Sequence, residues 1–127
     1  VFKLRLIEWL ILSEDVELLR EYIVNINKNQ YSQGISFNYK WIDVSIQVYN
    51  AWALFITDNK VEALKIIDEI DLLKLYIHEE RLVSIYYYAL SSRLHTGEKS
   101  NSSIKTLELL TKQTEYYGLN EMLNRIR

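Results

Sequence analysis

Cysteine and proline are absent from this sequence, and glycine is rare. Its 127 residues contain no cysteine, no proline and only three glycines, Gly34, Gly97 and Gly118. Because cysteine is missing, disulfides and cysteine-ligated zinc sites are excluded, which fits a reducing interior and leads us to expect a cytoplasmic location. Because proline is missing and glycine is rare, long helices are expected.

The chain also lacks a strong charge of either sign and a long apolar run. Its formal net charge is −2, so it carries no basic field that would attract nucleic acid. Arg5 and Glu8 interrupt the apolar stretch near the start, and no apolar run reaches the ~18 to 20 residues that cross a bilayer. We therefore expect neither direct DNA binding nor membrane association.

The length and the first residues bear on domain organisation. A chain of 127 residues fits one domain, and we interpret residues 1–127 as a single helical-repeat domain. The sequence begins at Val1 with a stretch that resembles the middle of a helix, and its only methionine is Met122. These features predict a fragment of a longer protein.

Apolar residues recur at helical spacing along most of the chain. Ser13, Asn59 and Ser100 are predicted N-caps, and Glu62 would complete a capping box with Asn59. Gly97 is a predicted helix terminator. The predicted helices span residues 2–12, 14–26, 38–56, 60–73, 77–95, 101–117 and 121–126.

Short polar breaks between the predicted helices recur at similar intervals. Val16 and Val61 begin matching segments at an offset of 45 residues, and Leu64 and Ile104 match at an offset of 40. These spacings approach the repeat lengths of α-solenoids. The predicted fold is all-α, with stacked antiparallel helical hairpins forming a tetratricopeptide-like α-solenoid of about six helices plus a short C-terminal helix. A plain helical bundle is the alternative.

No catalytic or metal-binding pattern stands out. His78, Glu79 and Glu80 are consecutive, so on a helix their side chains point in different directions. His95, in the last turn of a predicted helix, is interpreted as a surface residue. The acidic residues of the segment 68–71 have lysines on either side, which a solvated face explains. We expect no enzyme activity, no catalytic residue, no metal and no cofactor.

A polar stripe on the predicted helix 38–56 is the strongest site candidate. Asp43, Gln47 and Asn50 fall at positions i, i+4 and i+7, on one line along the helix. An asparagine or glutamine on the concave face of a solenoid can hold a peptide backbone with its paired donor and acceptor. The repeat offsets place Arg5 and Tyr86 on the same surface. A solvated helix face is the alternative interpretation.

Tyrosines and the C-terminal apolar residues provide two further candidates. Tyr86–Tyr88 are consecutive and sweep about 200° of a helix, so at least one of them should line a groove or an interface. The alternative is that two pack between hairpins and one lies on the surface. The last predicted helix has an apolar edge that either mediates dimerisation or caps the solenoid. That edge consists of Leu119, Met122, Leu123 and Ile126.

The order of these features resembles the C-terminal half of the Rgg/GadR/MutR transcriptional regulators. In that family an asparagine-containing helix, a short turn and an A-L-x-I-I helix precede a tyrosine-rich helix, a glycine turn and an Ile/Leu helix ending in glycine. The matching features cover about residues 38–126. They are Asn50, Ala63–Ile67, Tyr86–Tyr88, Gly97, Ile104–Leu110 and Gly118.

The resemblance implies a regulatory domain of a bacterial transcriptional regulator involved in quorum sensing. Members of the family carry an N-terminal helix-turn-helix domain, which would precede Val1, so contact with DNA would be made only by that missing domain. Their repeat domain dimerises and binds short, mostly apolar signalling peptides on its concave face. Only Asn50 carries over from the family as a peptide-binding residue. The alternative function is a generic tetratricopeptide-like scaffold for protein–protein interaction with no link to DNA.

Overall fold

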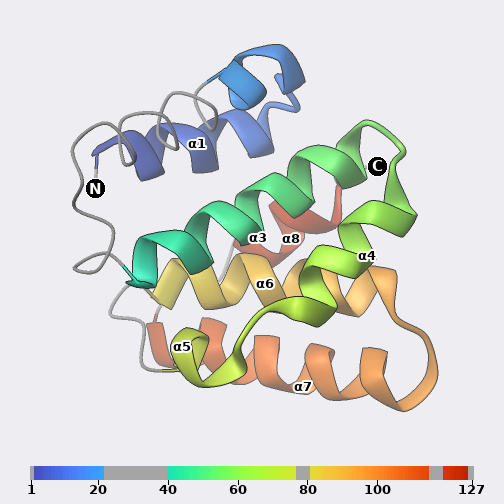
Figure 1. Ribbon diagram of the computed structural model, residues 1–127. Helices are drawn as coiled ribbons and strands as arrows, with labels where there is room; N and C mark the ends of the chain where they lie inside the picture. Colours follow the sequence, from blue (N-terminus) through green and yellow to red (C-terminus); the bar gives the residue numbers. More distant parts are fainter. Residues whose placement is uncertain (1, 22–39, 77–80, 115–118, 126–127) are drawn as a thin grey trace.

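The computed structural model describes residues 2–21, 40–76, 81–114 and 119–125. Every regular element in these ranges is an α-helix, so the prediction of an all-α fold is confirmed for them (Figure 1). The helices are α1 (Phe2–Leu12), α3 (Lys40–Ile56), α4 (Lys60–Glu69), α5 (Leu72–Tyr76), α6 (Arg81–Leu94), α7 (Gly97–Thr114) and α8 (Leu119–Asn124). Residues 16–21 are also helical. Gly34 and Gly118 lie outside the described ranges.

Helix α6 is the centre of the fold. It contacts α3, α4, α5, α7 and α8. In Figure 1, helices α1, α3, α6 and α7 follow one another across the molecule, and each neighbouring pair is in contact. Eight of the fourteen residues of α6 are buried, which means that neighbouring helices cover it on several sides.

Short elbows follow α1, α3 and α6, and the first two have the same backbone hydrogen bonds. At each, two N–H groups just beyond the helix donate back to carbonyls of its last turn, in the pattern of a Schellman motif. At the first elbow the N–H of Asp15 donates to the carbonyl of Leu10, and that of Glu14 to the carbonyl of Ile11, both with N···O distances of 3.0 Å. At the second elbow the N–H of Asn59 donates to the carbonyl of Leu54 at 2.8 Å, and that of Asp58 to the carbonyl of Phe55 at 3.1 Å. This pairing satisfies carbonyls that would otherwise have no partner at the helix end.

A left-handed residue occurs at all three elbows. The φ angles are +57° at Glu14, +65° at Asp58 and +64° at Gly97. Gly97 was predicted to end a helix, and glycine adopts this conformation without a steric penalty. For Glu14 the left-handed conformation costs about 1–2 kcal/mol, and for Asp58 the cost is smaller because a short polar side chain tolerates this conformation better. The predicted recurrence of a short break is therefore present, although two of the three residues are not the glycines that mark such turns in a sequence.

The side chains predicted as helix caps make other contacts. Ser13 donates to a carbonyl of its own helix, and Asp15 caps residues 16–21 instead, since its Oδ1 accepts from the backbone N–H of Leu18 at 3.4 Å. Asn59 makes no capping hydrogen bond, and its Nδ2 donates to Oγ1 of Thr57 at 2.9 Å. The predicted capping box is therefore wrong, because the asparagine amide bonds backward to the elbow and not forward to α4.

The predicted helix 60–73 is interrupted, contrary to the sequence interpretation. Helix α4 ends at Glu69, and Ile70 is extended, with φ −67° and ψ 131°. Asp71 then accepts a hydrogen bond from the N–H of Leu73 at 3.0 Å and starts α5. Leu73, at the end of the predicted helix 60–73, is 67% exposed, and Ile104 on α7 is 41% exposed. The break turns α5 away from the axis of α4 (Figure 1).

The core contains an aromatic cluster that joins α1, α3 and α6. The indole Nε1 of Trp52 donates to the backbone carbonyl of Tyr86 at 2.8 Å. The rings of Tyr49 and Tyr86 meet edge to face, with centroids 5.6 Å apart, a geometry that adds about 0.5–1.5 kcal/mol beyond area burial. The Tyr49 hydroxyl donates to the carboxylate of buried Glu8 at 2.6 Å. Three helices are thus fixed together by buried polar contacts as well as by packing.

We expect Tyr49→Phe to lower the free energy of unfolding by about 1–3 kcal/mol, because it removes a hydrogen-bond donor from a buried carboxylate while keeping the ring. Urea unfolding measures the change, with a shifted midpoint and an unchanged slope. Tyr76→Phe is the matched control, since Tyr76 is 75% exposed. Equal stabilities of the two variants would contradict the role given to the Tyr49–Glu8 contact.

Candidate functional site

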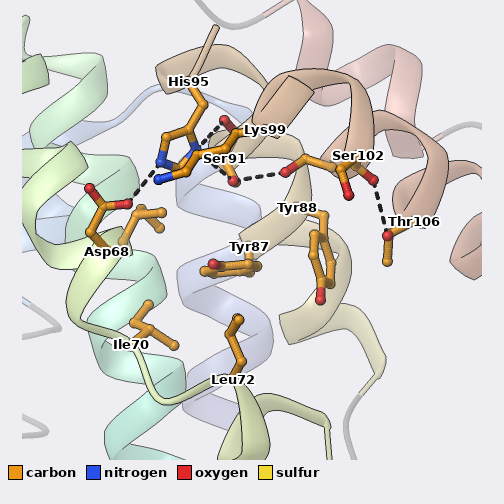
Figure 2. Close-up of a pocket in the computed structure, with 12 residues that line it drawn as sticks. Asp68, Ile70, Leu72, Tyr87, Tyr88, Ser91, His95, Lys99, Ser102 and Thr106 are labelled. Carbon is orange, nitrogen blue, oxygen red and sulfur yellow. Dashed lines mark hydrogen bonds and ion pairs between the residues drawn. The ribbon is translucent and has the colours of Figure 1, made fainter. Parts of the chain in front are cut away.

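A groove of about 370 Å³ opens between α4, α5, α6 and α7 (Figure 2). Its lining combines aromatic, aliphatic, hydroxyl and charged side chains. The lining residues are Ile67, Asp68, Ile70, Leu72, Tyr87, Tyr88, Ser91, His95, Lys99, Ser102, Ser103 and Thr106. Pockets of roughly 300–1,000 Å³ with a few convergent polar groups are typical binding sites for small ligands.

Helical periodicity brings the polar residues of α6 and α7 into the groove. Tyr87 and Ser91 are four residues apart on α6, and His95 follows four residues later in the elbow. On α7, the spacing of Ser102 and Thr106 is the same. Residues four apart lie on one face of a helix, and the tight α6–α7 elbow makes the two faces meet.

A chain of side-chain hydrogen bonds crosses one end of the groove. Asp68 Oδ1 lies 2.8 Å from His95 Nε2, and His95 Nδ1 lies 2.9 Å from Ser91 Oγ. Ser91 Oγ is also 2.9 Å from Ser103 Oγ. The chain therefore links α4 to the α6–α7 elbow and to both helices of that hairpin. Since the Asp68 side chain is 51% exposed, its contact with His95 adds only about 0.2–1 kcal/mol.

Aspartate, histidine and serine are the residue types of a hydrolytic triad, but their geometry here suits a structural link better. Ser91 is 3% exposed, and its hydroxyl oxygen lies between His95 and Ser103. A nucleophilic serine needs an open approach for its substrate on the side away from its base. Ser91 is 3% exposed and is engaged by both partners, so these hydrogen bonds tie the helices together.

Two tyrosines form the floor of the groove. Tyr87 and Tyr88 pack edge to face, with ring centroids 4.8 Å apart. Burial raises the pKa of Tyr87 to about 12, with smaller contributions from the neighbouring Tyr88 and Asp68. Burial also raises the pKa of Tyr88. Both hydroxyls therefore stay neutral at physiological pH and can donate or accept hydrogen bonds.

Gln47 and Asn50 of the predicted polar stripe lie away from this groove. Gln47 is exposed and Asn50 is half-buried on α3, and α3 does not line the groove. The side chains of Asp43 and Arg5 lie outside the described part of the chain. The binding roles given to these four residues stay predictions.

Tyr86 requires a correction, because it was expected on an open surface. It is 1% exposed and packs in the core against Tyr49 and Trp52. Its neighbours Tyr87 and Tyr88 line the groove instead, in agreement with the expectation that at least one of the three tyrosines lines a groove. The error arose because the repeat offset aligned Gln47 with Tyr86, and a shift of one residue rotates a helical side chain by about 100°.

The apolar edge predicted on the last helix is partly buried and partly exposed. Leu123 is fully buried, and its carbonyl accepts a hydrogen bond from Arg93 Nη1 at 2.9 Å. Leu119 is partly buried, Met122 is 43% exposed, and Ile126 lies outside the described residues. Leu123 therefore cannot serve as an open dimer contact in this structure, because its side chain covers the core beneath α8.

No sequence pattern predicted that Asp68 and His95 would meet. They are 27 residues apart, and each was interpreted as a solvated surface residue. The imidazole is in fact largely buried, with 12% of its side chain exposed. The i, i+4 spacing of Ser91 and His95 was the available local signal, but only the packing of α4 supplies the carboxylate.

The described part of the chain contains neither a metal site nor a membrane-spanning helix. Among the residues that the structure describes, no group of three or more histidine, cysteine or acidic side chains could hold a metal ion. None of the described helices has both the length and the apolarity needed to cross a bilayer. No protein-family model, curated protein or solved structure matches the chain.

The buried Tyr87 hydroxyl leads to a pH-dependent prediction. Between pH 10 and about 12 the unfolded chain loses the Tyr87 proton while the folded chain keeps it. The stability that this residue contributes is thus fully present below pH 10 and is lost as the pH rises through about 12. We expect Tyr87→Phe to lose less stability than the wild type over this interval, as measured by urea unfolding. Tyr76→Phe serves as control. If the free energy of unfolding falls equally with pH in Tyr87→Phe and in the wild type, the prediction is wrong.

Proposed function

We propose that this chain is the ligand-sensing domain of a bacterial transcriptional regulator and that it binds a short peptide in the groove between α4, α6 and α7. The observation that carries the proposal is the lining of that groove. Two tyrosine rings form the floor, hydroxyl side chains of α7 form one wall, and Ile70 and Leu72 form the apolar end (Figure 2). Apolar surface with a few convergent polar groups is what a peptide requires.

The helical arrangement supports a tetratricopeptide-like stack of hairpins as part of this proposal. The pairs α3–α4 and α6–α7 are each joined by a short elbow that contains a left-handed residue, and the two pairs contact each other through α3, α4 and α6. Stacked hairpins create extended surfaces that suit peptide segments. The resemblance to the Rgg/GadR/MutR regulators supports the link to transcription.

The proposal includes partners that follow from the resemblance. A homodimer would form through exposed parts of the C-terminal helix, where Met122 remains available. DNA would be bound only by a helix-turn-helix domain encoded before Val1, and the protein would act in the cytoplasm without catalytic activity. Peptide binding would change the geometry of the dimer, which requires a difference in affinity for two states of about 1–3 kcal/mol.

We expect Leu72→Asp to weaken peptide binding about tenfold, because it places a charge on the apolar end of the groove. An array of short linear peptides, anchored through their N-termini, selects a binding peptide, and calorimetry then measures its affinity. Leu109→Asp is the matched control, since Leu109 is as exposed as Leu72 (60% against 54%) but lies outside the groove.

The same measurement distinguishes the groove from the polar stripe on α3. If Asn50→Ala weakens the peptide and Leu72→Asp does not, the peptide binds on the α3 surface and the location proposed here is wrong. If no peptide on the array binds the wild-type domain, the proposed function itself is wrong.

The link to transcription is tested on the complete gene product. We expect the codons before Val1 to encode a helix-turn-helix domain and the full-length protein to sediment as a dimer. A coding sequence that lacks the DNA-binding pattern would contradict the regulatory role and would leave a scaffold for protein–protein interaction as the better explanation.

A further inference from the structure

We infer that the groove binds the C-terminal end of an apolar peptide and that Lys99 pairs with its free carboxylate. The inference rests on the proposed function and specifies the ligand of the same site. Its basis is the uneven polarity of the groove. In Figure 2, Asp68, His95 and Lys99 lie at one end, and Ile70 and Leu72 lie at the other. A ligand that fits both ends has a charged terminus and apolar side chains behind it.

The polar end of the groove carries the ammonium group of Lys99. Asp68 is paired with His95 at 2.8 Å, so its carboxylate already has a partner within the protein. Lys99 is exposed and makes no ion pair within the part of the chain that the structure describes. An anionic group on the ligand is therefore the complement of this end, and a charge-assisted hydrogen bond to an ammonium is among the stronger polar contacts.

The hydroxyl side chains of α7 that line the groove favour a peptide over a fatty acid that carries the same carboxylate. Thr106 Oγ1 donates to the backbone carbonyl of Ser102 at 3.1 Å, so its proton is already used. The lone pairs of that oxygen remain available to accept a hydrogen bond from a ligand. A peptide supplies backbone N–H donors next to its terminus, whereas an acyl chain supplies none.

The size of the groove favours the end of a peptide over its full length. Its volume of about 370 Å³ lies near the lower limit of about 300 Å³ for ligand pockets. Leu72 is 54% exposed at the apolar end of the groove, and Leu73 and Tyr76 of the same helix α5 are also exposed. The rest of the peptide would therefore continue over the apolar surface of α5.

The test compares one peptide in two forms that differ only in charge at the terminus. The apolar peptide selected on the array is synthesised with a free carboxylate and with a C-terminal amide, and calorimetry measures both affinities. We expect the wild type to prefer the acid about threefold to tenfold, a range typical of a partly exposed ion pair. High salt should reduce the preference, because Lys99 is exposed to screening.

Two lysine substitutions on α7 test whether Lys99 causes the preference for the peptide acid over the amide. We expect Lys99→Gln to bind the two forms equally, with unchanged affinity for the amide. Lys105→Gln should keep the preference, since Lys105 is exposed on α7 but outside the groove. This comparison is a double-mutant cycle between the side chain and the peptide terminus.

Other outcomes overturn the inference. If the wild type binds acid and amide equally, or if Lys99→Gln retains the preference, the carboxylate is not held by Lys99, while the proposed peptide-binding function still stands. If laurate binds the groove in a Lys99-dependent manner and more tightly than the peptide acid, the ligand is a fatty acid and the peptide assignment is wrong. If no peptide binds at all, the proposed function fails before this inference is reached.

Discussion

The hydrogen bond from the Trp52 indole to the Tyr86 carbonyl holds α6 against α3 in the core. The Tyr49 ring also packs against Tyr86 there. Since each residue turns a helix by about 100°, an inward Tyr86 leaves Tyr87 and Tyr88 turned away from it by about 100° and about 200°, and these two rings form the floor of the groove. The core and the candidate site are thus two faces of one helix, and a change in the first would alter the second.

The α6–α7 elbow determines which side chains of α7 face α6 across the groove. The left-handed Gly97 allows α7 to turn back along α6 within a few residues, which places the serine and threonine side chains of α7 opposite Ser91 and Tyr88. The Asp68–His95 contact then holds α4 against this hairpin. The contact is individually weak because Asp68 is half exposed. A link of this kind can break without unfolding the core, so the polar end of the groove is the part best suited to respond to a ligand.

Much of the secondary structure could be predicted from apolar periodicity and the rarity of helix breakers. The predicted bounds of α1 agree with the structure, and the elbows after α3 and α6 lie where polar breaks were recognised. The break at Ile70 was missed, because the apolar stripe continues through it and only the cap supplied by Asp71 reveals the new helix. The two elbow residues Glu14 and Asp58 adopt a conformation that their side chains do not favour, so local propensity could not identify them.

The all-α class and most of the turns between helices follow from the sequence alone, because they depend on residues close together along the chain. Which tyrosine is buried, which one lines the groove, and the meeting of Asp68 with His95 across 27 residues depend on tertiary packing. These features are set by the rotation and contact of whole helices. A side chain on a helix can face the core or the solvent with the same local sequence, and the packing of its neighbours selects between them.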